Sequence, residues 1–376
     1  MTAQPASSPA RPRGGWTIRV ERRLAVPGWL PPAVSLGAIL VALLLGAIVL
    51  GFVGGDPLAT YAHIGRAAFG SWGVFSDTMV KATPLILVGL ACSLAFRMRL
   101  WNIGAEGQFY MGALGASAVV LSGILPETTP AWIMLPAMML AGMLAGALWG
   151  AIPGWLKARL NVNEIITTLM LNYIAVALIN FFIFAVWSEA GFQMSKVFPK
   201  SAWLPRLADW AASVPAFRGL TTHFGLVLAV VAAGVIWYVL YRSLWGYEIR
   251  LIGDNPRAAQ YAGINISRNT VLVMMLSGAL AGLAGMSEIA GVVHRLQSAI
   301  SPGYGFTGII IAWLAKLNPL AVVPVAILFG GLILAGREIQ PAGVPRLIQG
   351  IILFTLIASE VLLRYRVRLV RAGAEE

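Results

Sequence analysis

Long stretches without charge are the feature of this chain that most constrains its fold. Asp, Glu, Lys and Arg are all missing from residues 24–55, 128–156 and 165–188. A helix needs about 20 consecutive apolar residues to cross a bilayer, so each stretch is long enough to do so. A membrane barrel is excluded, because its strands would be about ten residues long with alternating polarity. The chain is therefore predicted to cross a membrane repeatedly as α-helices.

Composition supports this class. Hydrophobic residues make up 59% of the chain and charged residues 11%, with a mean hydropathy of +0.80. Soluble domains, in contrast, are about one quarter charged. We predict an all-α, polytopic membrane protein, for which membrane lipid is an expected partner.

About ten segments are predicted to form transmembrane helices. Their expected bounds are 33–54, 77–96, 106–125, 131–156, 164–187, 219–241, 270–292, 306–315, 318–336 and 345–364. The eighth segment is too short to cross alone. It is expected to form a half-helix or to extend backward through residues 301–305, and broken helices of this kind occur in transporters.

Charge sets the expected orientation and domain organisation. The net charge is +12, and if all ten segments cross, most of the 27 lysines and arginines fall on one side. That bias is typical of cytoplasmic loops, so we expect both termini to be cytoplasmic and no nucleic-acid partner. The predicted domains are a flexible, basic N-terminal tail over 1–32, a transmembrane domain over 33–364 and a C-terminal tail over 365–376. The outer loop 188–219 is expected to form an interfacial aromatic belt or to contact an external partner.

Two glycine-bearing segments suggest an internal repeat. Gly89-Leu-Ala is followed by Asn102–Gly107, and Gly282-Leu-Ala-Gly is followed by Pro302–Gly305. The two following loops are expected on opposite sides of the membrane, as an inverted repeat requires. A chance match between glycine-rich spans is the alternative.

Polar residues inside apolar segments are candidates for function, because an unpaired polar group in hydrocarbon costs free energy. One group, Asn102, Glu106 and Gln108, lies among glycines at a predicted membrane boundary. The other, Asn163, Glu164 and Asn172, opens the segment 164–187 and continues into it. These six residues are predicted to line a translocation path. The alternative for the first group is a helix cap at Asn102 with Glu106 in the first turn.

The loop 242–268 is the prominent charged connection between predicted spans. Gly253–Pro256 is expected to form a turn, Pro256 to begin a short helix and Gly263 to end it. Such a helix suits docking into a groove on a partner, although an ordinary solvated loop is the alternative. The docking candidates are Gly253, Asp254, Asn255, Pro256, Arg257, Ala258, Ala259 and Gln260.

The other charged and titratable groups suggest no catalytic or metal site. Asp77 and Lys81 are one helical turn apart and are expected to neutralise each other. Glu288 and Glu360 are expected to reach the membrane interface, and a proton-relay role is the alternative. His63, His223 and His294 have no ligand spacing, so no metal site is predicted. Since no phosphate-binding loop or hydrolase motif occurs, the chain is not expected to be an enzyme or to hold a cofactor.

Four motifs resemble those of the membrane permeases of bacterial ABC importers for nucleosides and simple sugars, within the branched-chain-type superfamily. They are 102–108, 163–175, 253–264 and 303–308, and the resemblance covers roughly residues 36–363. It implies a multi-pass protein of the bacterial cytoplasmic membrane, and the long outer loop and basic tail resemble the longer permease of a pair. The implied partners are a homologous permease or second copy, ATPase subunits that bind ATP and Mg²⁺, and an extracytoplasmic solute-binding lipoprotein or periplasmic protein.

The resemblance also implies a mechanism. A binding protein would deliver solute to a path between two permeases, and the loop 242–268 would couple ATPase motion to alternating access. Nucleosides are the first expected substrates, followed by simple sugars. Alternatives are a branched-chain amino acid permease and a proton-coupled secondary transporter, which would need acids such as Glu106 and Glu164.

Overall fold

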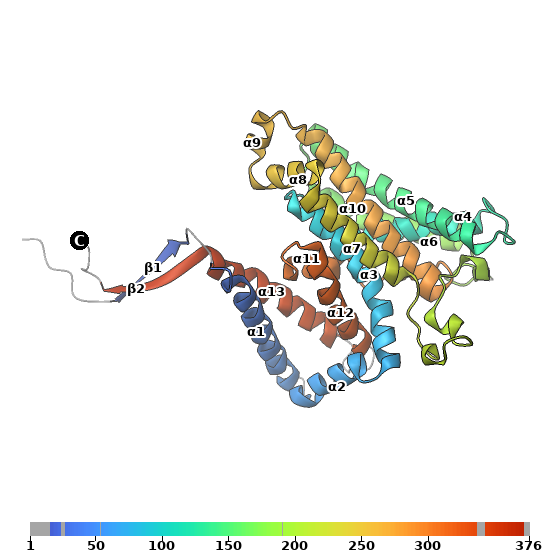
Figure 1. Ribbon diagram of the computed structural model, residues 1–376, viewed down its shortest axis with the longest axis horizontal. Coiled ribbons are helices and arrows are strands. Elements are labelled where there is room, and N and C mark those ends of the chain that lie inside the picture. The colour runs from blue at the N-terminus through green and yellow to red at the C-terminus, as the bar shows by residue number, and fades with distance from the viewer. Residues whose placement is uncertain (1–15, 24–26, 53, 190, 337–342, 372–376) are drawn as a thin grey trace, which may run out of the picture. The chain divides into compact units, whose positions relative to one another are not determined.

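The computed structural model describes residues 16–23, 27–52, 54–189, 191–336 and 343–371. The chain divides into two compact units, residues 1–49 with 350–376 and residues 50–349. Each unit is described separately below, and Figure 1 gives the element labels.

The first unit is formed by the two ends of the chain. It contains most of α1 (Leu30–Phe52) and α13 (Val344–Arg364), and the antiparallel strands β1 (Trp16–Arg22) and β2 (Tyr365–Arg371). The register pairs Ile18 with Leu369 and Val20 with Val367, so the apolar positions of the two alternating patterns coincide. The strands fall within the two predicted tails, β1 in the N-terminal tail over 1–32 and β2 in the C-terminal tail over 365–376.

The second unit contains eleven named α-helices within the described residues. They are α2 (Pro57–Phe69), α3 (Trp72–Arg97), α4 (Ala105–Leu121), α5 (Ala131–Leu160), α6 (Glu164–Phe181), α7 (Gly225–Arg242), α8 (Leu244–Asp254), α9 (Pro256–Tyr261), α10 (Ile266–Glu288), α11 (Tyr304–Leu314) and α12 (Pro319–Ala335). Helices α6 and α10 continue as π-helical turns over Phe182–Val186 and Ile289–Val293. Between α6 and α7 the chain forms three short 3₁₀ turns, Lys200–Ala202, Leu207–Trp210 and Pro215–Phe217.

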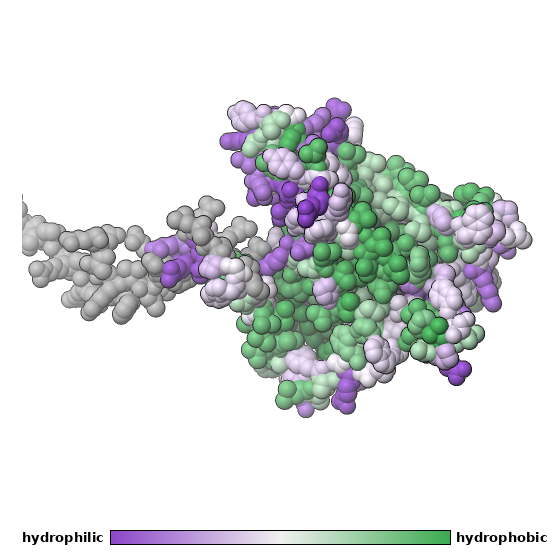
Figure 2. All heavy atoms as spheres, in the orientation of Figure 1, coloured by the Kyte–Doolittle hydropathy of each residue, from purple (hydrophilic) through white to green (hydrophobic). Residues whose placement is uncertain are grey.

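The helices confirm a polytopic membrane protein. Among the described residues, seven helices are long and apolar enough to cross a bilayer, and α11 and α12 are shorter apolar helices. Each of the ten predicted segments overlaps one helix, and the eighth is the 11-residue α11. Figure 2 shows a hydrophobic band over the long helices of the second unit and hydrophilic residues over α8 and α9.

Helix α2 was not predicted. Asp56 caps it by accepting hydrogen bonds from the backbone N–H groups of Leu58 and Ala59, and Pro57 occupies its first position. Its hydropathy is lowered by His63 and Arg66, which obscured it as a membrane segment.

Helices α3 and α10 lie antiparallel in the second unit. Lys81 bonds Glu288 near one end of the pair, and the Ser277 hydroxyl donates to the Ala91 carbonyl nearer the other. Helix α3 packs against α11 and α12, whereas α10 packs against α4 and α5. The helices thus form two sets of three, α3–α5 and α10–α12. The first helix of each set packs against the other two helices of the opposite set. This arrangement supports the predicted inverted repeat.

Glycines bring α4, α5 and α10 into close contact. A side chain on Gly146 of α5 would overlap the Gly278 carbonyl of α10, and one on Gly112 of α4 would overlap the Gly282 backbone. Since lipid gives no hydrophobic drive for helix association, such close backbone packing is a main source of stability in membranes. It fixes the depth at which the polar groups of α4 and α10 meet.

Candidate functional site

A buried amide pair lies at the start of α4, with Asn102 before the helix and Gln108 in its first turn. The Asn102 amide donates to Gln108 Oε1 at 2.9 Å, and the Gln108 amide donates back to Asn102 Oδ1 at 3.2 Å. Asn102 also donates to the Ser277 hydroxyl of α10, and its oxygen accepts from the Gly104 backbone. The alternative in which Asn102 caps α4 is wrong, because Gly104 is the N-cap residue of that helix and makes no side-chain cap bond. Asn102 instead joins the start of α4 to α10.

Helices α4 and α11 both begin inside the protein, and each N-terminus is held by a side chain from elsewhere. Asn172 of α6 accepts from the Gly107 N–H at 2.8 Å and donates to the Ile103 carbonyl. The Glu106 carboxylate of α4 accepts from the Gly305 N–H of α11 at 2.5 Å. Free N–H groups at a helix start attract acceptors and negative charge, so the two half-helices are joined through their positive ends.

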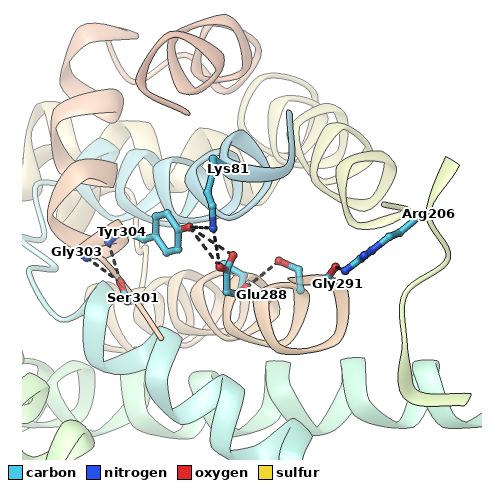
Figure 3. A network of polar contacts seen from close by, with 9 residues as sticks. Lys81, Arg206, Glu288, Gly291, Ser301, Gly303 and Tyr304 are labelled. Carbon is cyan, nitrogen blue, oxygen red and sulfur yellow. Dashed lines mark hydrogen bonds and ion pairs between the residues drawn. The ribbon is translucent and has the colours of Figure 1, made fainter. Parts of the chain in front are cut away.

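An ion pair that was not predicted lies beside this joint (Figure 3). Lys81 Nζ donates to Glu288 Oε1 at 3.0 Å and to the Tyr304 hydroxyl at 3.2 Å. The expectation that Asp77 and Lys81 neutralise each other is wrong. Lys81 pairs with Glu288 of α10, which is buried rather than at an interface, and Asp77 accepts from the Thr221 hydroxyl. The side chain of Glu360 lies outside the described residues.

The predicted path residues therefore divide into two groups. Asn102, Glu106, Gln108 and Asn172 are buried and meet around the start of α4. Asn163 instead caps α6, accepting from the Ile165 N–H at 2.9 Å, and Glu164 forms an ion pair with Lys157 at 3.0 Å. These two residues close the turn between α5 and α6 and take no part in the cluster.

The loop between α6 and α7 is hydrogen-bonded to the end of α10. Phe198 N–H donates to the His294 carbonyl, and Leu204 N–H to the Ala290 carbonyl. The His294 ring stacks on Trp203 with centroids 3.8 Å apart, and its Nε2 lies 2.7 Å from the Arg206 guanidinium. The loop is thus fastened to α10 rather than being only a belt of exposed aromatic side chains.

Burial and the Arg206 charge affect the pKa values of the two histidines near this loop, His223 and His294. Burial first, and Arg206 second, lower the pKa of His294 to about 4 and that of His223 to about 3. Both rings are therefore neutral near pH 7. Within the described part of the chain, no cluster of three His, Cys, Asp or Glu side chains gathers as metal ligands would.

The predicted docking loop contains two helices, α8 and α9. Pro256 begins α9, Asn255 caps it by accepting from the Ala258 N–H at 3.1 Å, and Gly263 follows it with a φ of 77°. The turn predicted at Gly253–Pro256 is wrong in part. Gly253 and Asp254 end α8, and Gly253 is buried so closely that a side chain would overlap the Arg97 carbonyl.

The docking candidates also differ in exposure. Ala259 is fully buried against its own chain, so it offers no docking surface. Ala258 is half-buried, and the exposed candidates are Asp254, Asn255, Pro256, Arg257 and Gln260. Tyr261, which was not predicted, is 94% exposed and is the most prominent apolar side chain of α9.

Comparison with known proteins assigns the chain to a family. Residues 74–358 match the model described as branched-chain amino acid transport system / permease component. The chain is 36% identical to a glucose ABC transporter permease protein of Haloferax volcanii, over 93% of each chain. It is 34% identical to a guanosine ABC transporter permease protein of Bacillus subtilis, over 88% of this chain and 94% of the relative.

A third relative extends the same comparison. A nucleoside ABC transporter permease protein of Lactococcus lactis is 32% identical over 83% of this chain and 85% of its own length. The matched residues include both half-helices and the loop that carries α8 and α9. The chain is a multi-pass membrane transport component and belongs to the branched-chain amino acid transport system / permease component family.

Proposed function

We propose that this chain is a permease subunit of an ATP-binding-cassette importer that carries nucleosides or related simple sugars. The observation that carries the proposal is its identity of 32–36%, over 83–93% of the chain, to permeases named for glucose, guanosine and nucleosides. Its paired half-helices support the same function, because interrupted helices build solute sites in membrane transporters.

The path forms between this chain and a second permease, either a homologue or a second copy. The buried cluster of Asn102, Glu106, Gln108 and Asn172 joins the half-helices that move during alternating access. Its residues are then exposed in turn to solute hydroxyl and amide groups, which they match as donors and acceptors. Binding along such a path is weak, since the path must also release its solute.

ATP hydrolysis takes place in a separate pair of ATPase subunits. Helix α9 docks on them with its exposed face and transmits their closure. Six residues are too few for a stable isolated helix, so α9 depends on packing against α8 and on its partner. Both termini and α9 are cytoplasmic in this proposal, the loop 188–219 faces an extracytoplasmic solute-binding protein, and the membrane is the cytoplasmic membrane.

Reconstitution tests the function. The chain is placed in liposomes with its cognate ATPase, second permease and solute-binding protein, and uptake of labelled guanosine, glucose and leucine is measured with and without internal ATP. We expect ATP-dependent uptake of guanosine or glucose, and no ATPase activity from the chain alone. Uptake of leucine alone would support a branched-chain amino acid permease. Uptake that needs no ATP and collapses with a protonophore would support a secondary transporter.

A further inference from the structure

A cavity with polar and charged lining residues lies beside the Lys81–Glu288 ion pair. Its volume is about 290 Å³, and it is lined by Asp77, Val80, Lys81, Arg206, Thr221, Gly291, Val292 and Leu334. These residues come from α3, from the loop between α6 and α7, from the π-helical end of α10 and from α12. Figure 3 shows Lys81, Glu288, Arg206 and Gly291 in this region of the molecule.

The charges around the cavity balance. Lys81 and Arg206 line it together with Asp77, and Glu288 stands behind Lys81 at 3.0 Å. Two cations thus face two carboxylates, so the site does not favour an anion or a cation strongly. A charge-balanced site with many donors and acceptors suits a neutral, polar molecule.

Asp77 and Lys81 on α3 offer a hydrogen-bond acceptor and a donor that hydroxyl groups can bond. Asp77 and Lys81 are one helical turn apart, so both side chains project from one face. Lys81 is nine-tenths buried, and two of the three N–H donors of its ammonium group go to Glu288 and Tyr304. Asp77 accepts from Thr221 and, as a carboxylate, has further acceptor positions. A hydroxyl group both donates and accepts, so neighbouring hydroxyls can bond both residues.

We propose that this cavity is a low-affinity solute site that binds the vicinal hydroxyls of a sugar, or of the sugar part of a nucleoside, before the solute reaches the half-helices. The proposal rests on the proposed import function. The volume lies at the lower edge of the range for small-molecule pockets and suits a single sugar ring. Contact with Lys81 links the site to Tyr304, the first residue of α11.

Thiol labelling tests the site independently of transport. The single native cysteine, Cys92, is fully buried, so a cysteine introduced at Thr221 is the accessible thiol. The complete transporter carrying Thr221→Cys is treated from outside with a membrane-impermeant thiol reagent, with guanosine, glucose or leucine present. We expect guanosine or glucose to slow labelling at least threefold and leucine to have no effect. Val292→Cys, also in the cavity wall, serves as a second reporter.

Two controls separate the possible outcomes. Ser213→Cys, exposed in the same loop and outside the cavity lining, is expected to react equally with and without solute. Asp77→Asn should weaken the solute protection about tenfold, because it removes a charged acceptor. Glu127→Gln, an exposed acid paired with Lys196, should leave it unchanged. Absence of protection at both reporters in a transporter that imports either solute would overturn the site alone, whereas failure of the wild-type transporter to import would overturn the proposed function.

Discussion

At the scale of single residues, the polar groups of the membrane helices are organised by contacts that are remote in sequence. Lys81 and Glu288 are 207 positions apart, and Glu106 and Gly305 are 199 apart. Each pair satisfies groups that hydrocarbon would leave without partners. Lys81 also donates to the Tyr304 hydroxyl, so Lys81 and Glu106 together hold α11 at its first two residues.

The Lys81–Glu288 pair gives a double-mutant prediction. Lys81→Met removes the counter-charge that Lys81 supplies to buried Glu288, and breaking a buried pair in this way typically costs about 3–5 kcal/mol. We expect the double variant Lys81→Met/Glu288→Leu to be more stable than Lys81→Met alone. Thermal unfolding in detergent measures both. If Glu288→Leu lowers the free energy of unfolding as much in the Lys81→Met variant as in the wild type, the two side chains do not interact.

A second prediction distinguishes the two groups of predicted path residues. Gln108→Leu leaves the buried Asn102 amide without its reciprocal partner, so we expect uptake to fall at least tenfold. Asn163→Ala removes only the α6 cap and should cost about 1 kcal/mol of stability. Uptake by the Asn163 variant should stay within twofold of wild type at equal expression. The reverse ranking would assign the transport role to the turn between α5 and α6.

Local patterns made some of these sites predictable from sequence, whereas remote contacts did not. The polar residues 102–108 and Asn172 stood out because their segments are otherwise apolar, and the structure brings them together. The Lys81–Glu288 pair could not be predicted, because the i, i+4 spacing of Asp77 and Lys81 suggested a local pair. That spacing puts two side chains on one helix face. It does not determine whether Lys81 forms its ion pair within the helix or with a carboxylate of a neighbouring helix.

At the scale of elements, close packing depends on glycines at regular intervals. Gly142, Gly146, Gly150 and Gly154 recur every fourth residue along α5, and each lies against α10. The apolar runs predicted the ends of most helices to within several residues. Helix α2 and strands β1 and β2 were missed, since their charged residues made them look like loops or tails.

Gly146→Ala tests the contact between α5 and α10. A methyl group there would overlap the Gly278 carbonyl, which is backbone and cannot rotate away. We expect a loss of about 1–3 kcal/mol, or more where the fold cannot relax, up to failure to fold. Gly234→Ala on α7 has open space around it and should be neutral or stabilise by about 0.5–1 kcal/mol. Folded yield and melting temperature compare the two; similar values would contradict a close-packed crossing.

Helix α9 gives a prediction about assembly. Arg257 and Tyr261 are exposed, and docking of α9 would bury them. The double variant Arg257→Glu/Tyr261→Ala is expected to reduce co-purification of the ATPase at least tenfold while membrane insertion stays normal. The exposed Arg159, at the end of α5, gives a matched charge reversal, Arg159→Glu, that should leave the complex intact. Unchanged co-purification of the double variant would identify α9 as a solvated connection. Ala259 is unsuitable for this test, because its substitution would disturb the fold itself.

At the scale of the whole molecule, stability should depend on pH through His223 and His294. Their pKa values in the folded chain, about 3 and about 4, lie below the ordinary value of about 6.5. The unfolded chain therefore binds protons first as pH falls, so the free energy of unfolding decreases from about pH 6.5 towards pH 4. Melting temperatures at pH 7.5, 6.0 and 5.0 should fall in that order. Combining His223→Asn with His294→Gln should flatten the trend; an unchanged slope would assign it to other groups.

The pairing of β1 with β2 also bears on how many times the chain crosses the bilayer. Hydrogen-bonded partners such as Trp16 and Arg371 cannot be separated by a bilayer, so both strands lie on the same side of it. The chain between them must then cross an even number of times. Among the described residues, seven helices are long and apolar enough to cross, which is an odd number. If all seven cross, the even number requires that a shorter apolar helix such as α12 also carry the chain from one face to the other.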